Sequence, residues 1–108
     1  MSNIPDNPLH IIEETTETQN SIVEIFNALR DLVLEKNKRY GDSALKPKNV
    51  FSKLNAGEAI KVRLDDKLSR VMNSGELRTN DVSDLIGYLT LYLISQNITR
   101  QDIIKEID

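Results

Sequence analysis

The stretch RLDDKLSR, residues 63–70, combines charges of both signs with two leucines in about two turns of a helix. At helical spacing, four of its side chains share one side: Arg63, Asp66, Lys67 and Arg70. Such a surface can bind a phosphate, either directly or through a bridging cation. The alternative is a solvated helix face with two ion pairs, Lys61 with Asp65 and Asp66 with Arg70.

The helix that carries this stretch is expected to begin at Gly57 or Glu58 and to reach Met72. Gly75 follows as a stop signal. The apolar residues of this helix recur at three- and four-residue spacing: Ile60, Leu64, Leu68 and Val71. The pattern predicts an amphipathic helix of which one side is buried.

A longer helix is predicted earlier in the chain. Ser21 and Glu24 fit a capping box, which would start the helix at Ser21, and the pattern runs to about Arg39. Its apolar stripe consists of Ile22, Ile25, Phe26, Leu29, Leu32 and Val33. Glu35 is spaced to pair with Arg39, and Gly41 is expected to end the helix.

A third helix is expected to start near Thr79, Asn80 and Asp81, each of which is a candidate N-cap. Its apolar stripe consists of Val82, Leu85, Ile86, Leu89 and Leu93. Small residues fall on a second side: Ser83, Gly87 and Thr90. Because small side chains let a neighbouring helix approach closely, this helix is expected to be central in the fold.

The pattern as a whole predicts an all-α bundle of three main helices and a short C-terminal helix capped by Thr99. Three amphipathic helices of this length have more apolar surface than they can cover for one another. A homodimer or higher homo-oligomer is therefore expected to complete the core. Residues 1–20 are polar and contain Pro5 and Pro8, which predicts a flexible arm before a single domain at residues 21–108.

The composition of the 108-residue chain excludes several classes of site. The absence of cysteine and the presence of one histidine leave no thiolate or histidine cluster, so a metal would be a hard ion such as Mg²⁺ held by carboxylates. No apolar run approaches the roughly 20 residues that span a bilayer, so we expect no membrane contact and a cytoplasmic protein. A net charge of −3 argues against a nucleic-acid polymer as partner.

Basic residues are concentrated in the middle of the chain. Residues 36–63 carry eight basic and two acidic side chains, whereas the segments on either side are acidic. Residues 44–56 interleave lysines with Asn49 and Phe51, a composition suited to contacts with phosphates and bases. The alternatives are that the lysines only solvate a loop and that Phe51 plugs the open end of the bundle.

Four segments together resemble a known family. They are Lys38–Ser43 (KRYGDS), Asn49–Phe51 (NVF), Val62–Arg70 (VRLDDKLSR) and Asp81–Tyr88 (DVSDLIGY). In this order they resemble the nucleotide-modification-associated domain family, type 1, which is common in bacteriophages. The resemblance covers roughly residues 22–95. It implies a helical protein of the host-cell cytoplasm that binds nucleotides.

That family is itself similar to the all-α, MazG-like nucleoside triphosphate pyrophosphohydrolases, in which two pairs of acidic residues hold Mg²⁺ against the triphosphate. The resemblance matches Asp81 and Asp84 to the second pair. The first pair is not intact, since Asp65 and Asp66 are followed by Lys67. If the chain used Mg²⁺, its ligands would be Asp65, Asp66, Asp81 and Asp84.

The leading hypothesis is that a phosphorylated nucleotide or cyclic nucleotide lies in a charged cleft between helices. One wall is expected to contain Lys38, Tyr40, Asp42 and Asn49. The other wall is expected to contain Arg63, Asp66, Lys67, Arg70, Asp84 and Tyr88. In this hypothesis Arg63, Lys67 and Arg70 bind phosphate, and Asp66 orients an arginine or binds a sugar hydroxyl.

Three alternatives stay open at this point. The first is a phage protein that sequesters a host defence nucleotide without turnover. The second is a pyrophosphohydrolase that depends on Mg²⁺. The third is a non-catalytic helical adaptor whose charged helix is only a surface. No serine, cysteine or histidine is placed for nucleophilic catalysis, and no glycine-rich phosphate motif is present.

Overall fold

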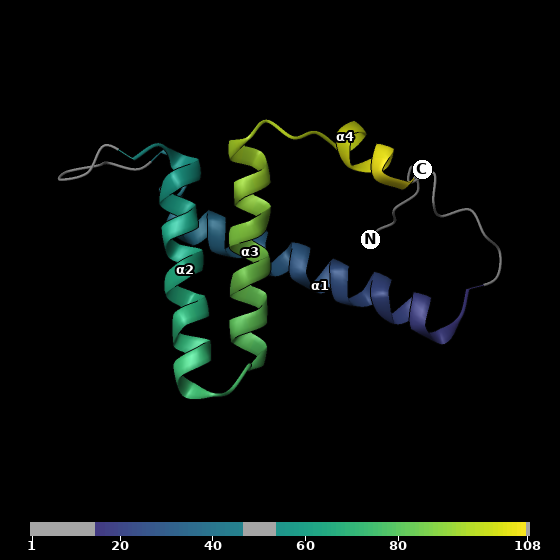
Figure 1. Cartoon of the computed structure of the whole chain (residues 1–108). Coiled ribbons are helices and arrows are strands. Elements are labelled where there is room, and N and C mark those ends of the chain that lie inside the picture. The colour runs from purple at the N-terminus through teal and green to yellow at the C-terminus, as the bar shows by residue number, and fades with distance from the viewer. Residues whose placement is uncertain (1–14, 47–53, 108) are drawn as a thin grey trace.

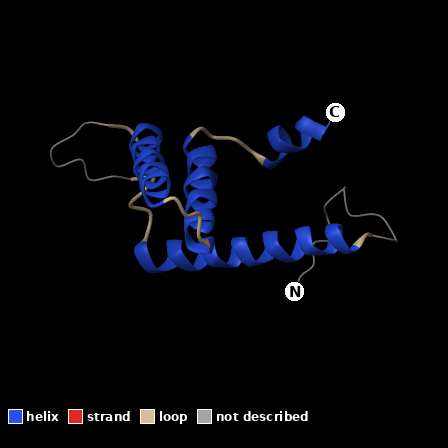
Figure 2. Cartoon of the chain, turned by 60° about the horizontal axis from the view of Figure 1, so that its bottom comes forward, coloured by secondary structure: helices blue, strands red, loops and turns tan. Residues whose placement is uncertain are grey.

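The computed structural model describes residues 15–46 and 54–107. Its helices are α1 (Glu17–Tyr40), α2 (Ala56–Ser74), α3 (Thr79–Ser95), α4 (Arg100–Ile104) and the short 3-10 helix η1 (Lys105–Ile107). Within these two ranges there is no strand (Figure 2). The prediction of an all-α fold with three main helices and a short C-terminal one is therefore confirmed. Over the same residues, no helix has the length and apolar character needed to cross a membrane.

Two of the three main helices form an antiparallel hairpin, and the third, which is the longest, crosses it. The helices α2 and α3 lie side by side and antiparallel, and α1 passes across them (Figure 1). The C-terminal half of α1 lies against this hairpin, while its N-terminal half extends beyond it (Figures 1 and 2). As predicted, α3 is central, since it packs against both α1 and α2.

The start of α1 differs from the prediction. The N-cap is Thr16, whose hydroxyl accepts from the backbone N–H of Gln19 at 3.0 Å, and the Gln19 side chain accepts from the Thr16 N–H at 3.0 Å. This capping box lies about one and a half helical turns before Ser21. The prediction that the helix starts at Ser21 is therefore wrong. Both sequences satisfy the same local pattern, and the earlier cap adds further helical turns. Residues 17–20 are thus helical, and residues 1–14 of the predicted arm lie outside the described residues.

We expect Thr16→Ala to destabilise the protein by about 1 kcal/mol, because it leaves the Gln19 N–H without its side-chain acceptor. Ser21→Ala, the matched control inside the helix, should change stability by less than about 0.5 kcal/mol. Urea unfolding followed by circular dichroism measures both. A larger loss for the Ser21 variant would contradict the cap at Thr16.

The remaining helix ends follow the sequence closely. Gly41 and Gly75 adopt φ values of 70° and 73° after α1 and α2, as their predicted role as stop signals requires. Asn55 caps α2 by accepting from the Glu58 N–H at 2.8 Å, a role that the sequence analysis missed. For α3 the N-cap is Arg78 and not one of the three predicted residues. Asp81 instead stands in the first turn and accepts from the Arg78 N–H at 3.0 Å.

The core of a single chain is small. Among the described large hydrophobic residues only Ile60 is fully buried, and no residue of α1 is buried. Of the charged residues that the structure describes, only Asp81 is buried. A chain of this length ordinarily buries a larger apolar core. Many large hydrophobic side chains of the three main helices are therefore left exposed in the single chain, among them Ile25, Phe26 and Leu89.

Candidate functional site

An ionic cluster joins all three main helices at the centre of the molecule. Lys67 of α2 places its Nζ 2.8 Å from Asp81 Oδ1 and 3.2 Å from Asp84 Oδ2, both on α3. Asp84 Oδ1 also accepts from Lys36 of α1 at 2.8 Å. The side chains of Lys67 and Asp81 are only 12% and 8% exposed, so this pair is shielded from solvent far more than the pairs on the helix surfaces, whereas Lys36 is about half exposed.

The cluster shifts the pKa values of its members in the directions that favour their charged forms. Hydrogen bonds to Asp81 and then Asp84 raise the pKa of Lys67 above its usual 10.5. The hydrogen bonds from Lys67 and from the Arg78 backbone lower the pKa of Asp81 below 3.8. Burial alone would raise the pKa of Asp84, but the hydrogen bonds from Lys36 and Lys67 outweigh it and lower this pKa.

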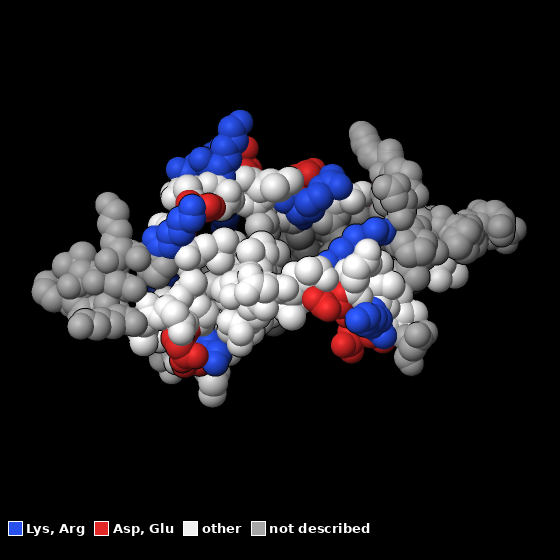
Figure 3. All heavy atoms as spheres, turned by 90° about the horizontal axis from the view of Figure 1, so that it is seen from above, with Lys and Arg blue, Asp and Glu red and all other residues white. Residues whose placement is uncertain are grey.

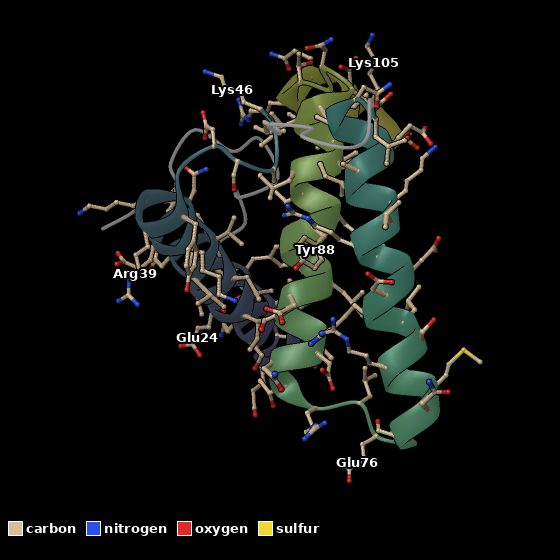
Figure 4. The ribbon with its side chains drawn as sticks, turned by 90° about the vertical axis from the view of Figure 1, so that its left-hand side faces the viewer. Glu24, Arg39, Lys46, Glu76, Tyr88 and Lys105 are labelled. Carbon is tan, nitrogen blue, oxygen red and sulfur yellow. The ribbon has the colours of Figure 1, made fainter. Side chains whose placement is uncertain are left out.

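A cavity of about 450 Å³ opens beside the ionic cluster. Its apolar walls come from Leu32 and Val33 of α1, Leu45 of the following turn, and Leu91 of α3. The aromatic ring of Tyr88 also lines it; Figure 4 shows this residue on α3, on the side that looks toward α1 and α2. The volume falls within the range of about 300–1,000 Å³ that is usual for small-molecule sites.

The rim of this cavity carries polar groups from three parts of the chain. They are Lys36, Asn37, Tyr40, Asp42, Arg63 and Asp84. Asn37 positions the turn after α1, because its amide donates to Asp42 Oδ1 at 2.9 Å and to the Gly41 carbonyl at 3.3 Å. Asp42 is therefore held at the rim by a neighbour on α1.

A second hollow of about 90 Å³ adjoins the first one. It is lined by Arg63, Asp66, Lys67, Arg70, Asp84 and Tyr88, so the two hollows share Arg63, Asp84 and Tyr88. Within the described residues, neither Arg63 nor Arg70 has an ion-pair partner. Two guanidinium groups without an ion-pair partner in the described ranges thus lie beside a cavity with apolar walls.

Most of the residues predicted for the site lie around these two hollows. The exceptions are informative. Lys38 lines neither of them, because at its position on α1 the side chain points away from the face that carries Val33 and Tyr40. Asn49 lies outside the described residues. The sequence analysis missed Lys36 and Asn37, although both continue the apolar stripe of α1 at three- and four-residue spacing from Val33 and Tyr40.

Lys67, predicted as a phosphate ligand, lines the smaller hollow and also has two carboxylate partners. Its ammonium lies between two carboxylates, which compensate its charge and hold it in place. The two local ion pairs considered from the sequence are absent among the described residues. Lys61 pairs with Glu58 at 3.1 Å instead of with Asp65, and Asp66 does not pair with Arg70. The predicted pair of Glu35 with Arg39 is confirmed at 2.9 Å.

The carboxylates predicted as Mg²⁺ ligands do not form a matching set. No three acidic or histidine side chains of the described residues come together as metal ligands. Asp81 and Asp84 converge on the Lys67 ammonium, which fills the position that a cation would take between them. Asp65 lines neither hollow. The residues present therefore do not fit a magnesium site of the predicted kind.

Comparison of this chain with protein-family models, with curated proteins and with solved structures found no match.

Proposed function

We propose that this protein binds a phosphorylated nucleotide across the two adjoining hollows. The observation that carries the proposal is that an apolar cavity with an aromatic wall adjoins a smaller hollow lined by two arginines, neither of which has an ion-pair partner in the described part of the chain. A nucleotide has two matching parts: a flat, weakly polar base at one end, which suits an apolar cavity, and an anionic phosphate at the other, which suits arginines. The family resemblance of the sequence points to the same class of ligand.

The larger cavity suits the base and the sugar. Tyr88 offers a ring for stacking, and Leu32, Val33 and Leu91 offer apolar contacts on the other walls. Asp42 and the Asn37 amide stand at the rim, where they can hydrogen-bond the polar edge of a base or a sugar hydroxyl. A few polar groups at the edge of an apolar pocket are the usual means of orienting a small ligand.

The smaller hollow suits the phosphate. Arginine binds phosphate through two parallel N–H groups, and such charge-assisted hydrogen bonds are stronger than neutral ones. Arg63 and Arg70 stand two turns apart on one side of α2, and Asp66 lies between them. Asp66 is placed to orient one guanidinium or to accept from a ribose hydroxyl.

The arrangement favours holding the nucleotide over hydrolysing it. Hydrolysis of the pyrophosphohydrolase type uses carboxylates that are available to a metal ion. In this chain Lys67 forms ion pairs with both Asp81 and Asp84, and Lys36 forms a further ion pair with Asp84. The proposed role is therefore a nucleotide-binding protein, either one that serves phage nucleotide metabolism or modification or one that sequesters a host signalling nucleotide.

Calorimetric titration with a panel of nucleoside mono- and triphosphates, including cyclic forms, tests this proposal. We expect at least one to bind about 100-fold more tightly than its nucleoside, because only the phosphate reaches the two arginines. Binding should be the same with Mg²⁺ and with EDTA, and chromatography after denaturation should return the nucleotide unchanged. No binding at millimolar nucleotide would refute the proposal, and release of pyrophosphate would establish the hydrolase instead.

A further inference from the structure

The apolar face of α1 continues past the hairpin and is left uncovered by the rest of the described chain. Val33 marks the crossing with α3, since a Cβ atom built on Gly87 would lie 3.7 Å from Val33 Cγ2. Toward the N-terminus the same face carries Ile22, Ile25 and Phe26. These side chains are 50%, 58% and 66% exposed, and this half of α1 projects beyond α2 and α3 (Figures 1 and 2).

A second uncovered apolar face lies on α3. Val82, Leu89 and Leu93 share one side of this helix at helical spacing, and each is between 38% and 50% exposed. This side is turned away from Gly87, where α1 packs. From Val82 to the end of α3 the only charged residue is Asp84, which belongs to the ionic cluster. Figure 3 looks down on the ends of α2 and α3 and shows an uncharged centre with charged residues toward the edges of that end of the molecule.

We propose that a second copy of this chain covers both faces in one reciprocal contact. The N-terminal half of α1 from each protomer packs on the outer side of α3 of the other, as two-fold symmetry allows. Each protomer carries both apolar faces, one on α1 and one on α3. The same α1–α3 contact therefore forms twice in the dimer and covers all four faces. Because both surfaces lack charge along their centre, a nucleic acid or a charged peptide would find no complementary groups there.

The spacing along α1 fits this arrangement. Phe26 lies seven residues before Val33, which corresponds to about 10.5 Å at 1.5 Å per residue. Packed helices are separated by about 8–10 Å. A partner's α3 that lies beside α3 in the same layer would therefore sit over Ile25 and Phe26. The two hairpins then form a layer of four helices, with one α1 on each side of it running antiparallel to the other.

The mass in solution tests the contact. Light scattering of the full chain should give twice 12.3 kDa. Phe26→Asp should raise the dissociation constant of the dimer on the order of 100-fold and give the mass of one chain. Leu34→Asp is the matched control, since Leu34 is 62% exposed on α1 but lies off the apolar face, and this variant should stay dimeric. A monomeric wild-type chain at its highest soluble concentration would overturn the proposal.

Disulfide cross-linking between introduced cysteines tests how the two protomers pack. The chain has no cysteine of its own, so any disulfide must join the introduced positions. After subunit exchange and mild oxidation, Phe26→Cys mixed with Leu89→Cys should form a covalent dimer, whereas neither variant alone should do so. In the proposed dimer the two Phe26 side chains lie on opposite sides of the four-helix layer. Cross-linking of Phe26→Cys to itself as fast as the mixture would exclude this packing. Neither test involves a nucleotide, so its result is independent of the proposed ligand.

Discussion

Replacing Lys67 by methionine should lower the melting temperature by about 10 °C, the largest loss expected from any single charged residue of this chain. Methionine preserves much of the side-chain volume but removes the ammonium that lies 2.8 Å from Asp81 and 3.2 Å from Asp84. Two carboxylates on one helix would then face each other, and Asp81 would lose its main counter-charge while still shielded from solvent. Thermal unfolding followed by circular dichroism gives the measurement.

Lys61→Met is the matched control on the same helix. Lys61 is half exposed, pairs with Glu58 and lies 5.8 Å from the centre of the Tyr92 ring, so this variant should lose only a few degrees of melting temperature. Adding Asp81→Asn to Lys67→Met should recover part of the loss, because the amide oxygen still accepts from the Arg78 N–H while the negative charge is gone. Equal losses for the Lys61 and Lys67 variants would show that the cluster has no special role.

The pH dependence of stability provides a second readout of the same cluster. The pKa values of Asp81 and Asp84 are lowered from 3.8, so their contribution is complete above about pH 4 and is lost as the pH falls through the lowered values. The pKa of Lys67 is raised from 10.5, so its contribution is complete below that pH and is lost as the pH rises through the raised value. Lys67→Met should flatten the acid limb of this profile.

Replacing both Arg63 and Arg70 by alanine should weaken nucleotide binding on the order of 100-fold while leaving affinity for the nucleoside unchanged. Both guanidinium groups line the smaller hollow and lack ion-pair partners among the described residues. Their removal therefore takes away phosphate contacts without breaking an internal pair. Calorimetry with the tightest-binding nucleotide of the panel measures the effect, and the melting temperature without ligand should be unchanged.

Arg30→Ala is the control for this pair. Arg30 lies on α1, lines neither hollow and, among the residues that the structure describes, forms an ion pair only with its neighbour Asp31. It should bind the nucleotide as the wild type does. If the Arg30 variant lost as much affinity as the double variant, the arginines would act only through overall charge. If the double variant bound the nucleoside more weakly as well, the phosphate would not be the group that they contact.

Much of the fold was predictable because it depends on local signals. Helix periodicity, the glycines after α1 and α2 and the Thr99 cap act within a few residues, and the prediction of three main helices and a short last one is confirmed. The start of α1 was wrong because two capping boxes lie five residues apart. Both satisfy the same local rule, so the pattern alone did not decide between Thr16 and Ser21.

The residues of the candidate site were largely predictable, but the partner of each charge was not. Arg63, Asp66, Arg70 and Tyr88 do gather around adjoining hollows. Lys67 has acidic neighbours in sequence, yet it pairs with Asp81 and Asp84 on another helix. An exposed pair within one helix gains little, whereas a shielded carboxylate strongly requires a counter-charge.

The amino-acid sequence by itself determined that the chain is helical, where most of its helices end and which side of each is apolar, because these properties depend on neighbours three or four residues apart. Only the packing of α1, α2 and α3 decided that Lys67 pairs with Asp81 and Asp84. The same packing leaves Arg63 and Arg70 without an ion-pair partner, and the N-terminal half of α1 uncovered, within the described part of the chain. Those outcomes depend on which side chains are brought out of water together, and that is decided by contacts between residues far apart in the chain.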